Sequence, residues 1–178
     1  MNQKNLLILD LDECLIHAAE KELDTACDFV MDQFFVYRRP HLDEFLEQMQ
    51  SAYALAVWSS GTELYVMELL AHIAPDIKFE FVFDRNRCTR RFDPERKDYF
   101  FLKDLKKVKE SGFDLDRVLI LEDEPRKVSR HYGNLVYVRP FYGGRSDEEL
   151  PPLAQYLLSI KDESNLRSID KRLWRKGA

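Results

Sequence analysis

Short apolar runs bounded by polar residues recur along the chain. Residues 6–9 read Leu-Leu-Ile-Leu, and residues 118–121 read Val-Leu-Ile-Leu. A strand that is covered on both faces shows such a continuous run instead of an alternating one, so both runs predict buried strands of a parallel sheet. Residues 53–58, 79–83 and 135–138 predict three further strands.

The segments between these runs carry the spacing of helices. Residues 42–49 place apolar side chains at i, i+3, i+4 and i+7, which predicts an amphipathic helix that packs on the sheet. Residues 64–71 predict a second helix that Thr62 caps, and residues 104–111 a third that Gly112 closes. Strands that alternate with helices predict an α/β fold with a parallel sheet flanked by helices.

Two further segments extend this pattern. Residues 28–38 hold two short runs rich in Phe and Val around a polar pair, which predicts a β-hairpin. Ser146 and Glu149 form a capping box that predicts the start of a helical region reaching Ile160.

Residues 1–160 are therefore predicted to form one domain, and residues 161–178 a C-terminal helical tail. Leu166, Ile169 and Leu173 lie at roughly helical spacing in this tail. A short amphipathic helix that packs on the domain is the favoured interpretation, and partner binding is the alternative.

Composition is that of a globular domain with one unusual stretch. The 178 residues suit a single domain with a sizeable core. The 27 basic and 32 acidic side chains give a net charge of −5, which argues against general coating of nucleic acid. Basic side chains nevertheless crowd residues 85–97, opposed only by Asp93 and Glu95, so this stretch is either a solvated loop or a local basic site.

The cysteines and the apolar runs predict a compartment. Cys14, Cys27 and Cys88 form neither a disulfide framework nor a zinc pattern. The first apolar run is too short for a signal peptide, and no stretch approaches the length of a membrane span. We therefore expect an intracellular protein without a membrane partner, cytoplasmic or, in a eukaryote, nuclear. A monomer is the favoured oligomeric state.

Two aspartates follow the first predicted strand, at the edge of the sheet where open α/β folds bind their ligands. Asp10 and Asp12 are spaced i and i+2, so their side chains share one face of an extended segment and could reach one metal ion or one substrate. A bare Asp-x-Asp is also a common turn or helix cap.

Five segments in order resemble the motifs of the haloacid dehalogenase superfamily. Within it, the chain resembles the small phosphatases of the RNA polymerase II carboxy-terminal repeat, which are NLI-interacting-factor-like phosphatases. The segments are residues 9–17, 39–45, 57–65, 102–105 and 118–125. The resemblance implies a Rossmann-like sheet with a small β-hairpin flap after the first strand and no large cap. The site would then stay open to a polymer.

The resemblance implies catalytic roles for four side chains. Asp10 would be the nucleophile that becomes an aspartyl-phosphate, and Asp12 would protonate the leaving alcohol and then activate water. Ser59 would bind the phosphate, and Lys103 would hold nucleophile and phosphate together against their repulsion. Hydrolysis of a phosphate monoester needs this neutralisation because the oxygens of the ester are negative.

The resemblance also implies a Mg²⁺ site. Asp10, Asp123 and the carbonyl of Asp12 would supply oxygen ligands. Glu122 stands where the family has an aspartate and is one methylene longer, so it would act on the metal through a water or would orient its neighbours. Acidic residues that oppose a helix dipole near Pro125 are the alternative interpretation.

Four residues are candidates for substrate binding. The amides of Ser60 and Gly61 would add donors for the phosphate, and Tyr65 would form one wall of a small apolar groove. Arg85 fits an Arg-x-x-Cys pattern in which the resemblance gives the arginine a substrate contact.

The leading functional interpretation is a Mg²⁺-dependent phosphatase of phosphoserine or phosphothreonine in proteins. A phosphatase of nucleic-acid ends is the second, because of the basic stretch at residues 85–97. An inactive scaffold that binds phosphoproteins is the third, because of Glu122.

Overall fold

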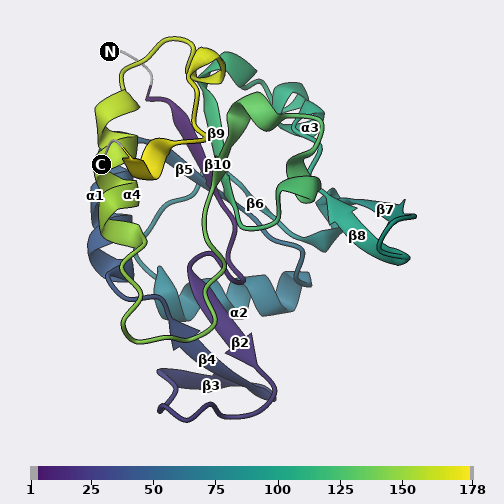
Figure 1. Ribbon diagram of the computed structural model, residues 1–178, viewed down its shortest axis with the longest axis vertical. Helices are drawn as coiled ribbons and strands as arrows, with labels where there is room; N and C mark the ends of the chain where they lie inside the picture. The colour runs from purple at the N-terminus through teal and green to yellow at the C-terminus, as the bar shows by residue number, and fades with distance from the viewer. Residues whose placement is uncertain (1–3, 177–178) are drawn as a thin grey trace.

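A five-stranded parallel sheet forms the centre of the computed structural model, which describes residues 4–176 (Figure 1). Its strand order is β10-β9-β1-β5-β6. The strands are β1 (Leu6–Leu9), β5 (Ala54–Trp58), β6 (Val82–Phe83), β9 (Val118–Glu122) and β10 (Leu135–Tyr137). The predicted α/β fold is confirmed, and every residue of β1 and β9 is buried, as a continuous apolar run requires.

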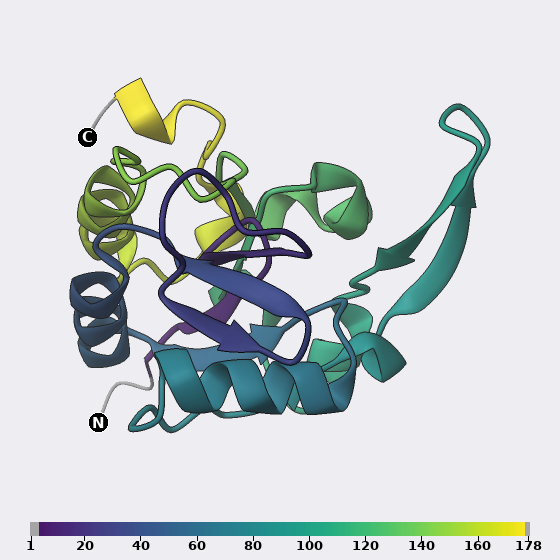
Figure 2. The ribbon, with the colours of Figure 1, turned by 90° about the horizontal axis from the view of Figure 1, so that it is seen from below.

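Helices cover both faces of the sheet (Figure 2). α1 (Leu42–Ala52), α2 (Glu63–Ile73) and α4 (Leu150–Ile160) share one apolar cluster with alternate strand residues such as Leu7. The short α3 (Lys106–Glu110) belongs to a second cluster, on the opposite side of the strands. The first two predicted helices are confirmed, and the third is shorter than residues 104–111, with Gly112 closing it at a φ of 95°.

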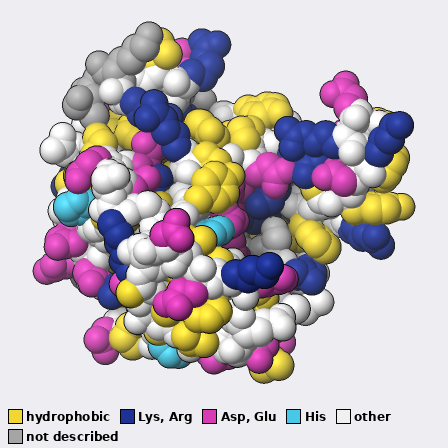
Figure 3. Space-filling view, turned by 60° about the horizontal axis from the view of Figure 1, so that its bottom comes forward, with side chains coloured by type: hydrophobic (Ala, Val, Ile, Leu, Met, Phe, Trp, Pro, Cys, Tyr) yellow, Lys and Arg dark blue, Asp and Glu magenta, His cyan; other side chains and the backbone are white. Residues whose placement is uncertain are grey.

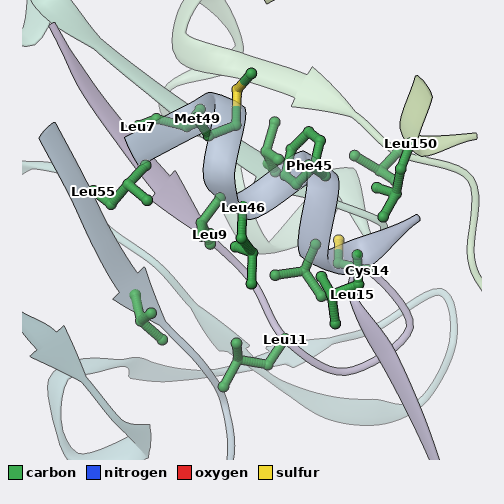
Figure 4. Close-up of a cluster of buried hydrophobic side chains, with 14 of the residues drawn as sticks. Leu7, Leu9, Leu11, Cys14, Leu15, Phe45, Leu46, Met49, Leu55 and Leu150 are labelled. Atoms are coloured by element: carbon green, nitrogen blue, oxygen red, sulfur yellow. The ribbon is translucent and has the colours of Figure 1, made fainter. Parts of the chain in front are cut away.

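Figure 4 shows why α1 is fixed on its face of the sheet. Phe45, Leu46 and Met49 form one stripe that lies in the same cluster as Leu9 of β1. Burying one such side chain contributes about 1.5–3 kcal/mol relative to exposure. Packing of this stripe therefore determines the position of the helix more than intrinsic propensity does.

A three-stranded antiparallel sheet lies beyond the carboxyl end of β1. It contains β2 (Ile16–Ala19), β3 (Phe29–Met31) and β4 (Phe34–Arg38), in the order β2-β4-β3. The predicted hairpin at residues 28–38 is the β3–β4 pair, with Asp32 in its turn at a φ of 51°. β2 extends this flap by one strand that the sequence pattern did not predict.

A two-stranded ribbon projects from one side of the domain (Figures 1 and 2). β7 (Thr89–Asp93) pairs antiparallel with β8 (Asp98–Leu102). The basic stretch at residues 85–97 is therefore largely an ordered ribbon rather than a solvated loop. In the sequence of this ribbon, only residues 100–102 of β8, Phe-Phe-Leu, have an apolar pattern.

Single 3₁₀ turns connect the remaining elements. They are η1 (Arg85–Arg87), η2 (Leu115–Arg117), η3 (Pro125–Val128), η4 (Tyr132–Asn134), η5 (Leu166–Ser168) and η6 (Trp174–Lys176). The predicted strand at residues 79–83 is shorter, because only the β6 residues pair with β5. Within residues 4–176, no helix has both the length and the apolar composition of a membrane span.

The capping box predicted at Ser146 and Glu149 is wrong. α4 begins at Leu150 without a side-chain cap. The Glu149 carboxylate instead accepts the backbone N–H of Arg139 at 2.9 Å and pairs with Arg175. Its charge is therefore used to attach the C-terminal segment and not to start a helix.

The predicted α-helix of the tail is also wrong, although the tail packs on the domain. Leu166 and Trp174 are buried, whereas Leu173 is 60 % exposed, and the backbone forms only the turns η5 and η6. The Trp174 ring stacks with Tyr156 of α4, and its Nε1 donates to the carbonyl of Tyr137 at 2.9 Å. Residues 177 and 178 lie outside the described residues.

We predict that Trp174→Ala lowers the free energy of unfolding by about 3 kcal/mol, because it opens a cavity and removes a hydrogen bond. Leu173→Ala serves as the matched control and should change it by less than about 0.5 kcal/mol, because that side chain is exposed. Urea unfolding of both variants checks this difference. Equal losses would show that the tail does not contribute to the fold through Trp174.

Candidate active site

Polar side chains follow three neighbouring strands at the same edge of the sheet. Asp10 comes after β1, Ser59 after β5 and Asp123 after β9. The strands are parallel and in register, with Leu9 beside both Val57 and Leu121, so their carboxyl ends meet. Of these side chains, Asp10 lines a cavity of about 430 Å³ that Phe34 of the flap and Ser60 of the loop after β5 also border.

A buried lysine joins two carboxylates at the centre of the site. Lys103 Nζ lies 2.8 Å from Asp10 Oδ1 and 2.6 Å from Glu122 Oε2, and all three side chains are almost completely buried. Charges taken out of water are costly unless they are paired in this way. The backbone N–H of Lys103 donates to the carbonyl of Lys127 at 2.7 Å, which fixes the lysine beside η3.

The excess of negative charge changes how these groups bind protons. Burial, and then the charge of Glu122, raise the pKa of Asp10 to about 6. For Lys103, burial acts to lower the pKa, but the Asp10 and Glu122 carboxylates outweigh it and raise the pKa of the ammonium. Asp10 therefore needs a second positive charge to be fully ionised below neutral pH.

Two buried carboxylate oxygens could accept this second positive charge. Asp10 Oδ2 and Asp123 Oδ1 are buried, and neither has a hydrogen-bond partner within residues 4–176. Oxygens of Asp10 and Asp123 approach each other within 4.8 Å, together with the sulfur of Cys14. Burial raises the pKa of the Cys14 thiol well above its usual value, so it remains protonated and is a poor ligand. The orphaned oxygens fit a hard cation such as Mg²⁺.

Glu122 has partners that the sequence did not predict. Its Oε2 contacts Lys103, and its Oε1 accepts the backbone N–H of Glu124 at 3.1 Å. It does not belong to the group of ligand atoms formed by Asp10, Cys14 and Asp123. The longer side chain thus reaches the lysine and leaves the expected direct role on a metal ion to Asp123.

Lys127 was not predicted and is the second cation of the site. Its Nζ lies 3.9 Å from Asp10 Oδ2, 3.9 Å from Asp123 Oδ1 and 3.4 Å from Glu122 Oε1. Burial acts to lower its pKa, but these carboxylates outweigh it and raise the pKa. In sequence, Lys127 had no signal beyond its position in the turn after Pro125, whereas Lys103 stood in a recognisable local pattern.

Asp12 lines the cavity. The hydroxyl of Tyr65 donates to Asp12 Oδ1, and Ser59 Oγ donates to Asp12 Oδ2 at 3.4 Å. Burial raises the pKa of Asp12. The carboxyl is thus held on the cavity side of the strand and is prepared to carry a proton, as a general acid must be.

The loop after β5 brings Ser59, Ser60 and Gly61 to the cavity. Ser59 Oγ accepts the N–H of Gly61 at 2.9 Å, and Ser60 Oγ is buried without a partner in the described chain. A Cβ on Gly61 would lie 2.6 Å from a ring carbon of Tyr65, so a larger residue would displace that ring. Tyr65 itself packs edge-on against Phe34 of the flap, 6.1 Å between ring centroids.

Arg85 occupies the outer rim of the cavity. Its Nε donates to the carbonyl of Ser60 at 2.6 Å, and its guanidinium lies 5.0 Å from the centroid of the Phe101 ring. The structure therefore brings all the predicted catalytic, metal and substrate residues into one region. Their roles in a reaction remain predictions.

Comparison with known proteins agrees with the motifs. A family model described as NLI interacting factor-like phosphatase matches residues 5–167. "CTD nuclear envelope phosphatase 1" of Xenopus tropicalis is 28 % identical, over 97 % of this chain and 76 % of the relative. The human "Carboxy-terminal domain RNA polymerase II polypeptide A small phosphatase 1" is 28 % identical, over 94 % of this chain and 64 % of the relative.

Other matches show how much of the relatives this chain represents. "CTD small phosphatase-like protein 2" of Dictyostelium discoideum is 27 % identical over 90 % of this chain, which spans only 28 % of that protein. A solved structure of Fcp1, titled as an essential RNA polymerase II CTD phosphatase, superposes with a TM-score of 0.61 at 18 % identity. That match covers 92 % of this chain and 51 % of the other. This last likeness concerns the fold alone.

We predict that Asp10→Asn raises the melting temperature of the metal-free protein at pH 7.5 by about 2–6 °C. Asp10 binds its proton more tightly in the folded state, because its pKa of about 6 exceeds the unfolded value of 3.8. The stabilisation that comes from binding this proton is fully present below pH 3.8 and is lost as the pH rises through 6. An uncharged asparagine at this position therefore restores that stabilisation at pH 7.5.

Thermal unfolding in chelator at several pH values measures this effect. The advantage of the variant should shrink as pH falls from 7.5 toward 4. A variant that is less stable than wild type at pH 7.5, or a difference that does not change with pH, would contradict the assignment of Asp10 as a strained buried carboxylate.

Proposed function

The chain belongs to the NLI interacting factor-like phosphatase family, a family of phosphoric monoester hydrolases, and from this premise we propose a reaction for its site. The chain would hydrolyse phosphoserine or phosphothreonine in proteins, with Mg²⁺, through an aspartyl-phosphate, the acyl phosphate formed on Asp10. The observation that carries the proposal is the Asp10 carboxylate. One of its oxygens is fixed by Lys103, and the other is buried without a hydrogen-bond partner in the described chain.

In the first step, one oxygen of the Asp10 carboxylate attacks the phosphorus, and the bond from phosphorus to the serine or threonine oxygen breaks. Asp12 gives its proton to that leaving oxygen. Ser60 Oγ and the amides of the loop after β5 are positioned for the phosphate oxygens. Lys103 keeps the charge of Asp10 balanced while the negative phosphate approaches.

In the second step, Asp12 accepts a proton from water, and the resulting hydroxide attacks the phosphorus of the aspartyl-phosphate. The bond from phosphorus to the Asp10 oxygen breaks, and inorganic phosphate leaves with the carboxylate restored. Asp10, Asp123 and the carbonyl of Asp12 would hold a Mg²⁺ ion, which would supply positive charge to the phosphate. Glu122 would orient Lys103 rather than bind the ion.

A protein substrate fits the shape of the site. The segment between β1 and α1 holds only the three-stranded flap, so the cavity is not enclosed by a cap domain. Tyr65 and Phe34 offer a small apolar wall for a residue near the phosphate. The human relative and the Fcp1 structure are both named as phosphatases of the carboxy-terminal domain of RNA polymerase II. These names support the same substrate class. An intracellular location, cytoplasmic or nuclear, belongs to this proposal.

The two alternatives have different support. The arginines of the β7–β8 ribbon favour a nucleic-acid-end phosphatase as the second candidate. The scaffold hypothesis rested on Glu122, and this residue keeps a 2.6 Å contact with Lys103, so its presence is no reason to expect an inactive site.

Phosphate release from an aryl phosphate, with and without Mg²⁺, tests the proposal. We predict Mg²⁺-dependent turnover by the wild type. In Asp123→Ala, half-maximal activity should require at least about 10-fold more Mg²⁺, because a direct ligand is lost. Glu122→Ala is the matched control in the adjacent carboxylate. It should reduce kcat by about 10²-fold or more through Lys103 while changing the Mg²⁺ requirement much less.

Three outcomes are decisive. Activity that is unaffected by chelator would remove Mg²⁺ from the mechanism. Equal Mg²⁺ titrations for the two variants would show that the ligand role is shared with Glu122. Absence of turnover in the wild type at every Mg²⁺ concentration would favour the phosphoprotein-binding scaffold.

A further inference from the structure

One face of the β7–β8 ribbon alternates aromatic rings with arginines. Residues that pair directly across an antiparallel ribbon point to the same face, so Arg90 with Phe101 and Phe92 with Tyr99 share one face. Arg85 joins them because its guanidinium lies over the Phe101 ring. We call these five residues the aromatic–arginine face.

The members of this face support one another and remain accessible. The Arg90 guanidinium lies 3.9 Å from the centroid of the Tyr99 ring, and the Tyr99 and Phe92 rings are 5.1 Å apart. Phe92 is 53 % exposed and Tyr99 is 58 % exposed. Figure 3 shows the projecting lobe at the right of the view, where hydrophobic and basic side chains lie together. Guanidinium groups stacked on rings are held in place without being neutralised.

The opposite face of the same ribbon is already neutralised. Arg126 from η3 pairs with Asp93 at 3.1 Å and with Asp98 at 2.9 Å, and it lies over the ring of Phe100. Neither Arg90 nor Arg91 forms an ion pair within residues 4–176, but Arg91 and Arg126 together balance Asp93 and Asp98, whereas the aromatic–arginine face contains no carboxylate. The unbalanced positive charge of the ribbon is therefore concentrated on the aromatic–arginine face.

This face is continuous with the active site. Arg85 lines the cavity and donates to the carbonyl of Ser60 in the loop after β5. Phe101 and Tyr99 are two residues apart on β8, so the guanidinium groups over them are separated by about 7 Å, or two residues of an extended peptide. The β7–β8 ribbon that carries this face projects outward from the domain (Figure 2).

We propose that the aromatic–arginine face binds an acidic segment of the phosphoprotein substrate, such as a second phosphorylated serine near the one being hydrolysed. The inference rests on the proposed function and adds a specificity for multiply phosphorylated sequences. Arg90 is the specificity-determining residue, because it offers an uncompensated charge beyond the rim arginine.

An acidic peptide suits this face better than a nucleic acid does. The chain as a whole carries a net charge of −5, so a long polyanion would meet repulsion away from the ribbon. Two guanidinium groups in line give room for one or two anionic groups, not for a continuous backbone of phosphates. The exposed rings would pack against the apolar parts of an extended peptide.

The test compares a reference peptide, which has one phosphoserine with neutral neighbours, with a series of doubly phosphorylated peptides. Each peptide of the series carries an additional phosphoserine two, four or six residues away, on one side or the other. We predict that for the best placement the additional phosphate raises kcat/KM about fivefold, mainly through KM, which is the range of an exposed charge pair. Arg90→Ala should abolish this gain.

Arg91→Ala is the matched control, because Arg91 has the same charge in the same strand and points to the opposite face. It should keep most of the gain. Equal kcat/KM for the singly and doubly phosphorylated peptides at every placement, or equal losses in the two variants, would overturn the inference. Preference for 5′-phosphorylated oligonucleotides, with a steep salt dependence, would replace it with nucleic-acid binding.

Turnover of an aryl phosphate separates failure of this inference from failure of the proposed function. If the wild type hydrolyses the aryl phosphate but ignores the second phosphate of the peptides, only the docking face is wrong. If the aryl phosphate is not hydrolysed, fluorescence anisotropy of the labelled peptides still decides about the face. Tighter binding of the doubly phosphorylated peptide, lost in Arg90→Ala and kept in Arg91→Ala, would support it, and equal binding would overturn it.

Discussion

The site depends on the pairing of the buried Lys103 ammonium with the carboxylates of Asp10 and Glu122. Two carboxylates and one ammonium out of water are stable together only because each charge has a close partner. Removing the ammonium would leave two buried carboxylates without their partner, a change that typically costs about 3–5 kcal/mol. The contact also requires β1 and β9 to be neighbours and the start of η3 to lie beside Lys103, so the topology of the sheet is built around it.

This arrangement leaves the site negative, which explains its other features. Asp10 and Asp123 each keep a buried oxygen without a hydrogen-bond partner in the described residues, and the pKa of Asp10 rises to about 6 through burial and Glu122. Lys127 lies close to both carboxylates without a contact as short as those of Lys103. A site of this charge favours a cation and then a phosphate, in an order set by electrostatics.

The sequence predicted those parts that have one dominant physical signal. The buried strands, the stripe of α1 and the aspartates at the sheet edge each follow from apolar pattern or register. The β7–β8 ribbon was not predicted because Arg90, Arg91 and Phe92 are all exposed, and a ribbon exposed on both faces has no apolar alternation. The tail was predicted as a helix because spacing alone cannot show that Leu166 is buried while Leu173 is exposed. The partners of Glu122 depend on side-chain length in three dimensions, which a motif does not contain.

We propose above that Asp10 forms a covalent aspartyl-phosphate, and borohydride trapping tests this most directly. The protein is mixed with excess phosphoserine peptide and Mg²⁺, quenched in acid during turnover and reduced, which converts a phosphorylated aspartate into homoserine. Mass spectrometry of the peptide that contains Asp10 and Asp12 then locates the product. The account predicts homoserine at position 10 only. Phosphate release in the same sample without any homoserine, or with homoserine at position 12, would contradict it.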